Sequence, residues 1–529
     1  MTAGAHTKEE LRVDDGTDQG QRLSGTTRRG LVLLVAALAL GILGDALLRA
    51  GPPGLNAFLW ILSLAAVYLV LDKRGVLTQS TESAREPGPA QGRWMLAPAL
   101  LLAAGFLWRD SPALQLLDVL GLGLTLGLAS AYARGGDLRR AGILDYGLNV
   151  ALAGLQTAVG LVPLLAWDIK WNQLPRDSRR DRALALMRGL AVALPLLVLF
   201  GSLFTAADAV FAHLVNRTLD VNLDNLASHV LLALFWAWLA AGWLRAAALG
   251  KSAPDLALGR PAGLVVGGIE TGVVLGSLNA LFLAFVLVQF RYFFGGAALV
   301  QATTGLTYAE YARHGFFELV GVSALLLPLL LLGHWLQPQD RPAQGRLFRW
   351  LAAALVAQLF VIMASAVQRM LLYQREYGLT ELRLYTTAFM LWLSLLFFWF
   401  LATVLRRRQE RFAFGVLVSG MVLLLALHAL NPDGLIVRAN VARLAAGRTF
   451  DAAYAASLSA DGVPALVTAL PLLNEADCRT VTASLLERWS PPRKSDWRTW
   501  NWGRARAHAE TERSAPLRCS ARAPWFDNG

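Results

Sequence analysis

Residues 307–336 read TYAEYARHGFFELVGVSALLLPLLLLGHWL and place a cluster of ionisable and aromatic side chains directly before a long apolar run. The apolar part, residues 316–336, is long enough to cross the hydrocarbon core of a bilayer as a helix. Thr307 and Glu310 have the S/T-x-x-E spacing of a capping box, which predicts that a helix begins there and continues into the apolar run. This stretch therefore indicates a membrane helix with a polar entrance.

The polar entrance is the first candidate functional cluster. Glu310, His314 and Glu318 recur every four residues, so they share one face of the expected helix. Burying such groups at the rim of a membrane helix is costly unless they pair with each other, with a ligand or with water. Two carboxylates and an imidazole suit metal or proton chemistry, but a salt-bridged entrance that includes Arg313 is the favoured interpretation. The predicted cluster comprises Tyr308, Glu310, Tyr311, Arg313, His314 and Glu318.

Catalytic signatures do not accompany this cluster. No second E-x-x-H and no H-E-x-x-H motif completes a metal site, and the sequence has no nucleophile elbow or P-loop. We therefore predict no catalytic residue, no metal and no cofactor.

Composition defines the class of protein. Hydrophobic residues make up 55% of the 529 residues and charged residues 16%, and the mean hydropathy is +0.46. Such an apolar, segmented chain is typical of a polytopic membrane protein. The apolar runs are 30–48, 55–71, 94–108, 114–132, 146–167, 183–204, 230–249, 273–294, 316–336, 348–370, 386–405 and 412–430. We expect an all-α transmembrane bundle of about 11–12 spans.

The runs and the polar segments between them divide the chain into five parts. Residues 1–29 are expected to form a disordered polar tail, 30–182 the N-terminal membrane helices, and 183–430 a membrane core. Residues 431–490 have short amphipathic patterns that predict a helical extramembrane domain, with Asp461 and Asn474 placed to cap two of its helices. Residues 491–529 are rich in Trp and Arg, and the tryptophans of this tail suit docking on the domain or at the membrane interface.

Charge predicts the orientation. The net charge of +12 comes largely from arginines in short runs beside the apolar segments, which favours cytoplasmic flanks over a nucleic-acid surface. The N-terminus is then cytoplasmic and the C-terminal domain extracytoplasmic. Basic loops on both sides of residues 146–167 conflict with a single crossing there, so either this segment is re-entrant or one loop breaks the rule.

Polar residues inside the membrane runs form a second candidate set, consisting of Glu270, Asn279, Gln289 and Arg291. Pairing between neighbouring helices is the favoured role, and a transport path is the alternative. Cys478 and Cys519 both follow the last apolar run, so they are expected to form a disulfide if the domain is outside and to be free thiols if it is inside.

Several phrases together resemble a known family. They are LNALFLAFV from Leu278, LTYAEYARHGFFEL from Leu306, YGLTELRLY from Tyr377, NPD from Asn431, DAAY from Asp451 and DGVPAL from Asp461. Over about residues 183–502 the chain looks like the bacterial membrane family known as domain of unknown function 4173. This resemblance implies a bacterial inner-membrane protein and no established activity.

Three classes of function are compatible with these patterns. The favoured class is a non-enzymatic sensor, envelope-assembly or partner-binding component, because the polar and aromatic segments gather on the expected outer face. It would bind a protein partner or a small ligand there, besides the lipid bilayer. The second class is a transporter whose path is lined by polar groups of residues 273–294 and 316–336. A membrane-embedded enzyme is the third.

Overall fold

A computed structural model describes residues 24–77, 91–173, 223–250, 267–304, 316–337, 342–406, 408–491 and 494–514, with a few positions between 189 and 208. All regular elements in these ranges are helices. Nine of the described helices are long and apolar enough to cross a membrane. They are α1 (Gly25–Leu48), α2 (Leu55–Lys73), α4 (Pro112–Ala131), α9 (Leu223–Leu249), α10 (Gly268–Thr304), α12 (Phe316–Trp335), α13 (Pro342–Tyr377), α14 (Glu381–Thr403) and α15 (Phe412–Leu430). The prediction of an all-helical polytopic bundle is confirmed.

The N-terminal half of the membrane part forms one packed group, which we call the first lobe. It consists of α1, α2, α3 (Leu96–Trp108), α4, α5 (Ile143–Val159) and α9 around one apolar core. Helices α1 and α9 run antiparallel in close contact, because Gly41 and Gly44 leave no side chain between them. A Cβ atom at Gly44 would lie 2.6 Å from the Trp236 ring.

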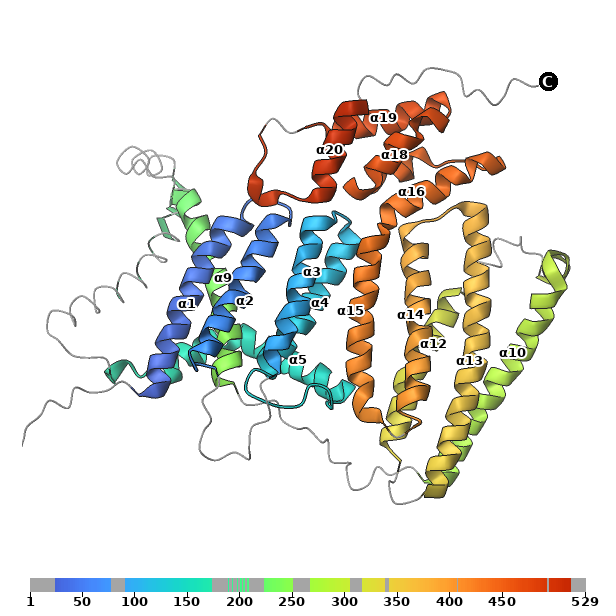
Figure 1. Ribbon diagram of the computed structural model, residues 1–529, viewed down its shortest axis with the longest axis horizontal. Helices are drawn as coiled ribbons and strands as arrows, with labels where there is room; N and C mark the ends of the chain where they lie inside the picture. Colours follow the sequence, from blue (N-terminus) through green and yellow to red (C-terminus); the bar gives the residue numbers. More distant parts are fainter. Residues whose placement is uncertain are drawn as a thin grey trace, which may run out of the picture.

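The second lobe consists of α10, α12, α13 and α14, and its core includes Leu355, Leu359, Phe397 and Phe400. Helix α15 packs against α4 of the first lobe and against α14 of the second. It therefore stands between the two lobes, as Figure 1 shows.

The segment with basic flanks on both sides is a bent helix pair. Helix α5 is followed by α6 (Leu161–Pro163) and η2 (Leu164–Asp168) after a bend of 55°. The two ends of the pair lie at one end of the lobe: Tyr146 donates to the Leu138 carbonyl in the loop after α4, and Asp168 pairs with Arg245 near the end of α9. The structure thus supports the re-entrant alternative, since Arg139 and Lys170, which flank the pair, lie at the same end of the bundle.

A C-terminal helical domain covers the opposite end of the bundle, above α2, α3, α4, α15 and α14 (Figure 1). Its helices are α16 (Pro432–Ala442), α17 (Ala452–Ser457), α18 (Val463–Ala469), α19 (Glu475–Trp489) and α20 (Trp502–Ser514), with the short 3₁₀ helices η5 (Leu444–Ala446), η6 (Ala460–Gly462), η7 (Leu470–Leu472) and η8 (Trp497–Thr499). Their shared core includes Ile436, Val437, Leu466 and Val481. Because α20 packs on α18 and α19, part of the tail belongs to the domain.

The expected cap at Asn474 is confirmed. Its side-chain oxygen accepts a hydrogen bond of 2.9 Å from the backbone N–H of Asp477, in the first turn of α19.

Candidate functional site

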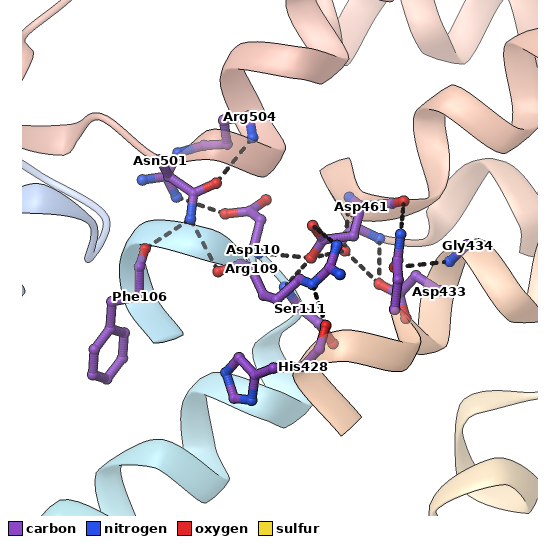
Figure 2. A network of polar contacts seen from close by, with 12 residues as sticks. Phe106, Arg109, Asp110, Ser111, His428, Asp433, Gly434, Asp461, Asn501 and Arg504 are labelled. Carbon is purple, nitrogen blue, oxygen red and sulfur yellow. Dashed lines mark hydrogen bonds and ion pairs between the residues drawn. The ribbon is translucent and has the colours of Figure 1, made fainter. Parts of the chain in front are cut away.

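The site lies where the C-terminal domain meets the turn between α3 and α4. Asp461, in η6, points into this turn (Figure 2). Its Oδ2 accepts hydrogen bonds from the backbone N–H groups of Asp110, at 2.7 Å, and Ser111, at 3.1 Å. These are the last two N–H groups before α4 begins at Pro112, and a carboxylate near a helix N-terminus is stabilised by the helix dipole.

Asp461 therefore serves a membrane helix and not the helix that follows it in sequence. We expected it to cap the helix that contains Val463 and Leu466, but the residue that precedes that helix is Gly462. The carboxylate of Asp461 is directed across the domain boundary instead.

A second buried carboxylate, Asp433 of α16, lies beside Asp461. Its Oδ2 accepts hydrogen bonds from the backbone N–H of Ser459, at 3.2 Å, and from the Ser459 hydroxyl. Its Oδ1 has no hydrogen-bond partner within the described part of the chain. Burial raises the pKa of Asp433 to about 6, against the hydrogen bonds from Ser459 that lower it. Burial likewise raises the pKa of Asp461 to about 6.

Arg109 connects these carboxylates to the membrane helices. Its NH1 lies 3.6 Å from Asp461 Oδ1, and its Nε donates to the carbonyl of His428 at 2.7 Å. The imidazole of His428, on α15, pairs in turn with Asp118 of α4 at 3.0 Å, and both side chains are buried. Asp461, Arg109, His428 and Asp118 thus form a continuous series of ionisable groups from the domain into the bundle.

Asn501 and Arg504 of the α20 region hold the tips of two hairpins. The Asn501 amide donates to the carbonyls of Phe106, at 2.7 Å, and Arg109, at 3.0 Å, at the end of α3. Its oxygen accepts from the backbone N–H of Arg504, so one side chain satisfies groups of α3 and α20 together. Arg504 also reaches Asp110 at 2.6 Å and the carbonyl of Pro53, between α1 and α2, at 2.9 Å.

Asn440 of α16 holds the tip of the hairpin between α13 and α14. It accepts from the backbone N–H of Leu379 at 2.7 Å and donates to the carbonyl of the same residue at 2.8 Å. Gly378, with φ +79°, turns the chain here, and a Cβ atom on it would lie 2.6 Å from the Asn440 oxygen. Asn440, Asp461, Asn501 and Arg504, which we call the docking network, thus fix hairpin tips of both lobes.

Most of the predicted cluster at the α12 entrance lies outside the described residues, namely Tyr308, Glu310, Tyr311, Arg313 and His314. Glu318 is described and is exposed near the start of α12. The cluster stays a prediction.

The predicted intramembrane set is described in part. Asn279 donates to the carbonyl of Leu351 at 3.1 Å and accepts from Gln358 at 3.2 Å, so it joins α10 to α13. Glu270 is exposed, and Gln289 and Arg291 belong to α10 with side chains outside the description. The hydrogen bonds of Asn279 thus connect two neighbouring helices, as expected for a structural role.

Cys478 is buried in α19, whereas Cys519 lies outside the described residues, so their disulfide stays a prediction. Among the described residues, no group of three or more His, Cys, Asp or Glu side chains is arranged to hold a metal ion.

The sequence reasoning missed the docking network. A usable signal was present in the short polar gap Arg109-Asp110-Ser111 between two apolar runs, since a turn this short leaves helix-end groups that need outside partners. The motif beginning at Asn431 also marks a helix start, because Asn431 adopts φ 53° and accepts from the N–H of Gly434.

Fold and site together define a multi-pass helical membrane protein with a C-terminal domain docked on its helix ends. The family model described as Domain of unknown function (DUF4153) matches residues 96–469, well over half of the chain, and the chain therefore belongs to this family. The resemblance to family 4173 was wrong in the particular family, although both are families of unknown function. Neither the comparison with curated proteins nor that with solved structures gives a match.

Proposed function

We propose that this chain is a non-enzymatic membrane component that receives a signal or partner at its C-terminal domain and couples it to the arrangement of the two lobes. The observation behind this proposal is the docking network, in which one domain holds the α3–α4 tip of the first lobe and the α13–α14 tip of the second. A displaced domain would leave these buried helix-end groups unpaired, at roughly 1–3 kcal/mol for each group. Domain and hairpin tips are therefore expected to move together.

The distribution of charge supports an extracytoplasmic position for the domain. Basic residues near span ends gather at the end opposite the domain, and they include Arg74, Arg139, Arg140, Arg346, Arg406 and Arg411. By the positive-inside rule that end is cytoplasmic. In a bacterial inner membrane the domain would then face the periplasm.

The coupling is tested by distances between the lobes. Spin-labelled amino acids replace Arg74, after α2, and Arg406, after α14, which are both exposed at the end away from the domain. Pulsed electron paramagnetic resonance then measures their separation in single-chain nanodiscs. We expect Asn440→Ala and Asn501→Ala to shift or broaden the distance distribution, because each removes the hydrogen bonds of one docking residue to the tip of one lobe.

Asn474→Ala is the matched control, since Asn474 caps α19 within the domain and makes its hydrogen bonds to Asp477. It should leave the distances unchanged. Unchanged distances in both docking variants, with hydrogen exchange showing that the domain has been released, would contradict the proposal.

A proton-coupled transporter is the second candidate, and the buried Asp118–His428 pair favours it. Ionisable groups within spans often mark ion pathways, and this pair lies on α15, between the lobes, and on α4. Proteoliposomes with a pH-sensitive dye inside test it. Wild-type protein should dissipate an imposed proton gradient and Asp118→Asn should not, whereas equal leakage in both would remove this candidate.

A further inference from the structure

Three tryptophans lie exposed in the short segment that leads into α20. The exposed fractions of Trp497, Trp500 and Trp502 are 61%, 45% and 52%. Large aromatic side chains are seldom exposed to water in such a group. We therefore expect lipid or another protein surface to cover this segment.

Hydrogen bonds fix this segment at the level where the spans end. The Trp500 carbonyl accepts from the backbone N–H of Leu55, the first residue of α2, at 2.9 Å. Arg498 donates to the carbonyl of Ala46, in the last turn of α1, at 2.5 Å. In Figure 1 the red segment before α20 runs across the upper ends of α1 and α2.

Three other exposed tryptophans lie at the same level or at the opposite one, whereas Trp238 and Trp350 are exposed within the spans α9 and α13. Trp108, exposed by 42%, is the last residue of α3 at the domain end. Trp94 and Trp167 are exposed at the other end of the bundle, in the 3₁₀ turn Gly92–Met95 just before α3 and near the end of η2. Tryptophan is enriched at both membrane–water interfaces, where its ring lies at headgroup depth. The two groups therefore coincide with the two faces of the expected bilayer.

We propose that residues 497–502 are an interfacial lipid anchor that places Trp497, Trp500 and Trp502 among the headgroups of the leaflet beneath the C-terminal domain. The occupant of this surface is the bilayer that the chain itself spans, because the segment is already held at the ends of α1, α2 and α3. Each indole has an apolar body for the acyl boundary and an N–H donor for the headgroups.

The charges nearby are compatible with this depth. Asp496 and Arg498 form an ion pair at 2.6 Å, so the segment brings no unpaired carboxylate to the lipid surface. The anchor adds to the docking network a second, lipid-dependent attachment of the domain. It does not depend on which leaflet the domain faces.

Depth-dependent fluorescence quenching tests the anchor. A fluorescent amino acid is placed at Trp497 in the full chain, with one chain per nanodisc, and the same amino acid at Leu486 is the control. Leu486 is exposed by 43% on α19, which lies on the far side of the domain from the bundle (Figure 1). Two quenchers are used, phosphatidylcholine with bromine near the headgroup end of its acyl chains and aqueous iodide.

We expect brominated lipid to quench position 497 at least about twofold more than position 486, and iodide to show the reverse order. Iodide quenching at 497 equal to that at 486, without lipid quenching, would overturn the proposal by placing the segment in water. Protection from both quenchers would also overturn it, since protein and not lipid would cover the ring. If the 497 variant does not fold, the same probe at Trp502 gives the same test.

Discussion

Two neighbouring carboxylates of the site have different hydrogen-bonding environments. Asp461 receives two backbone N–H groups and faces Arg109, yet burial still raises its pKa to about 6. Asp433 has Ser459 on one oxygen and no hydrogen-bond partner among the described residues on the other. Desolvation is nevertheless the largest influence on both carboxylates, and it raises the pKa of each to about 6.

This environment predicts a stability that falls as pH rises. The unfolded carboxyl has a pKa of about 3.9. Since the folded state binds the proton more tightly, stability is highest below about pH 4, decreases up to about pH 6 and stays lower above it. The charged groups that act on Asp433 include Asp110 and Glu381, which raise its pKa further, and Arg109 lies close by.

Asp433→Asn should weaken this dependence and leave the part that comes from Asp461, whose pKa is also about 6. At pH 7.5 we expect the apparent Tm in detergent to rise, and the free energy of unfolding to increase by up to ~2–3 kcal/mol, because the buried charge of Asp433 is removed. Glu487→Gln is the control, because Glu487 is an exposed residue of α19. This variant should keep the pH profile of the wild type. A variant profile with the full wild-type slope would show that Asp433 contributes nothing to the pH dependence.

At the scale of elements, the bent pair α5–α6–η2 depends on close backbone contact with α9. Gly160 and Gly242 face each other, and a Cβ atom at Gly242 would lie 2.9 Å from the Thr157 Cα and nearer still to its carbonyl. Backbone atoms cannot move aside as a flexible side chain can, so the two helices would have to separate. The hydrogen bond from Trp238 to the Ala158 carbonyl, at 2.8 Å, depends on the same contact.

Gly242→Ala should therefore lower stability by about 1–3 kcal/mol through overpacking. Gly154→Ala is the matched control, because nothing lies within 4 Å of its added Cβ and alanine favours a helix. The apparent Tm of both variants is measured in the same detergent. Equal Tm values would mean that α5 does not depend on this contact with α9.

At the scale of the whole molecule, the two lobes meet α15 at their centre and the C-terminal domain at one end. Described basic residues that include Arg74, Arg139 and Arg406 lie at the other end, and both ends of the bent pair α5–α6–η2 lie there too. By the positive-inside rule this arrangement supports the proposed orientation, with the domain outside.

Labelling in intact cells tests this orientation. In a chain without its two native cysteines, Arg479→Cys places a thiol on the exposed part of α19, and Arg74→Cys places one at the basic end. A membrane-impermeant maleimide should label position 479 directly and position 74 only after permeabilisation. The opposite pattern would invert the topology.

The membrane architecture could be predicted because the length and hydrophobicity of a local run of residues are enough to identify a membrane helix. The cap at Asn474 was predictable for the same reason, since Asn474 and the N–H group that it binds are three residues apart. The Asp461 contact was not, because its partners are 351 and 350 residues away and a capping side chain has no local signal that names a distant helix. Charge alone did not determine the topology of residues 146–167, because only the contacts of Tyr146 and Asp168 show that both ends of the segment lie at one end of the lobe.

The central claim is that the domain holds both lobes as one unit, and hydrogen exchange in Asn440→Ala tests it most directly. This substitution removes the two hydrogen bonds to Leu379 in the second lobe. It does not alter Asp461 or Asn501, the residues that bind the first lobe. If the domain docks cooperatively, the N–H groups of Asp110 and Ser111 lose protection together with that of Leu379, and Asn474→Ala changes neither tip. Loss of protection at Leu379 alone would contradict the claim.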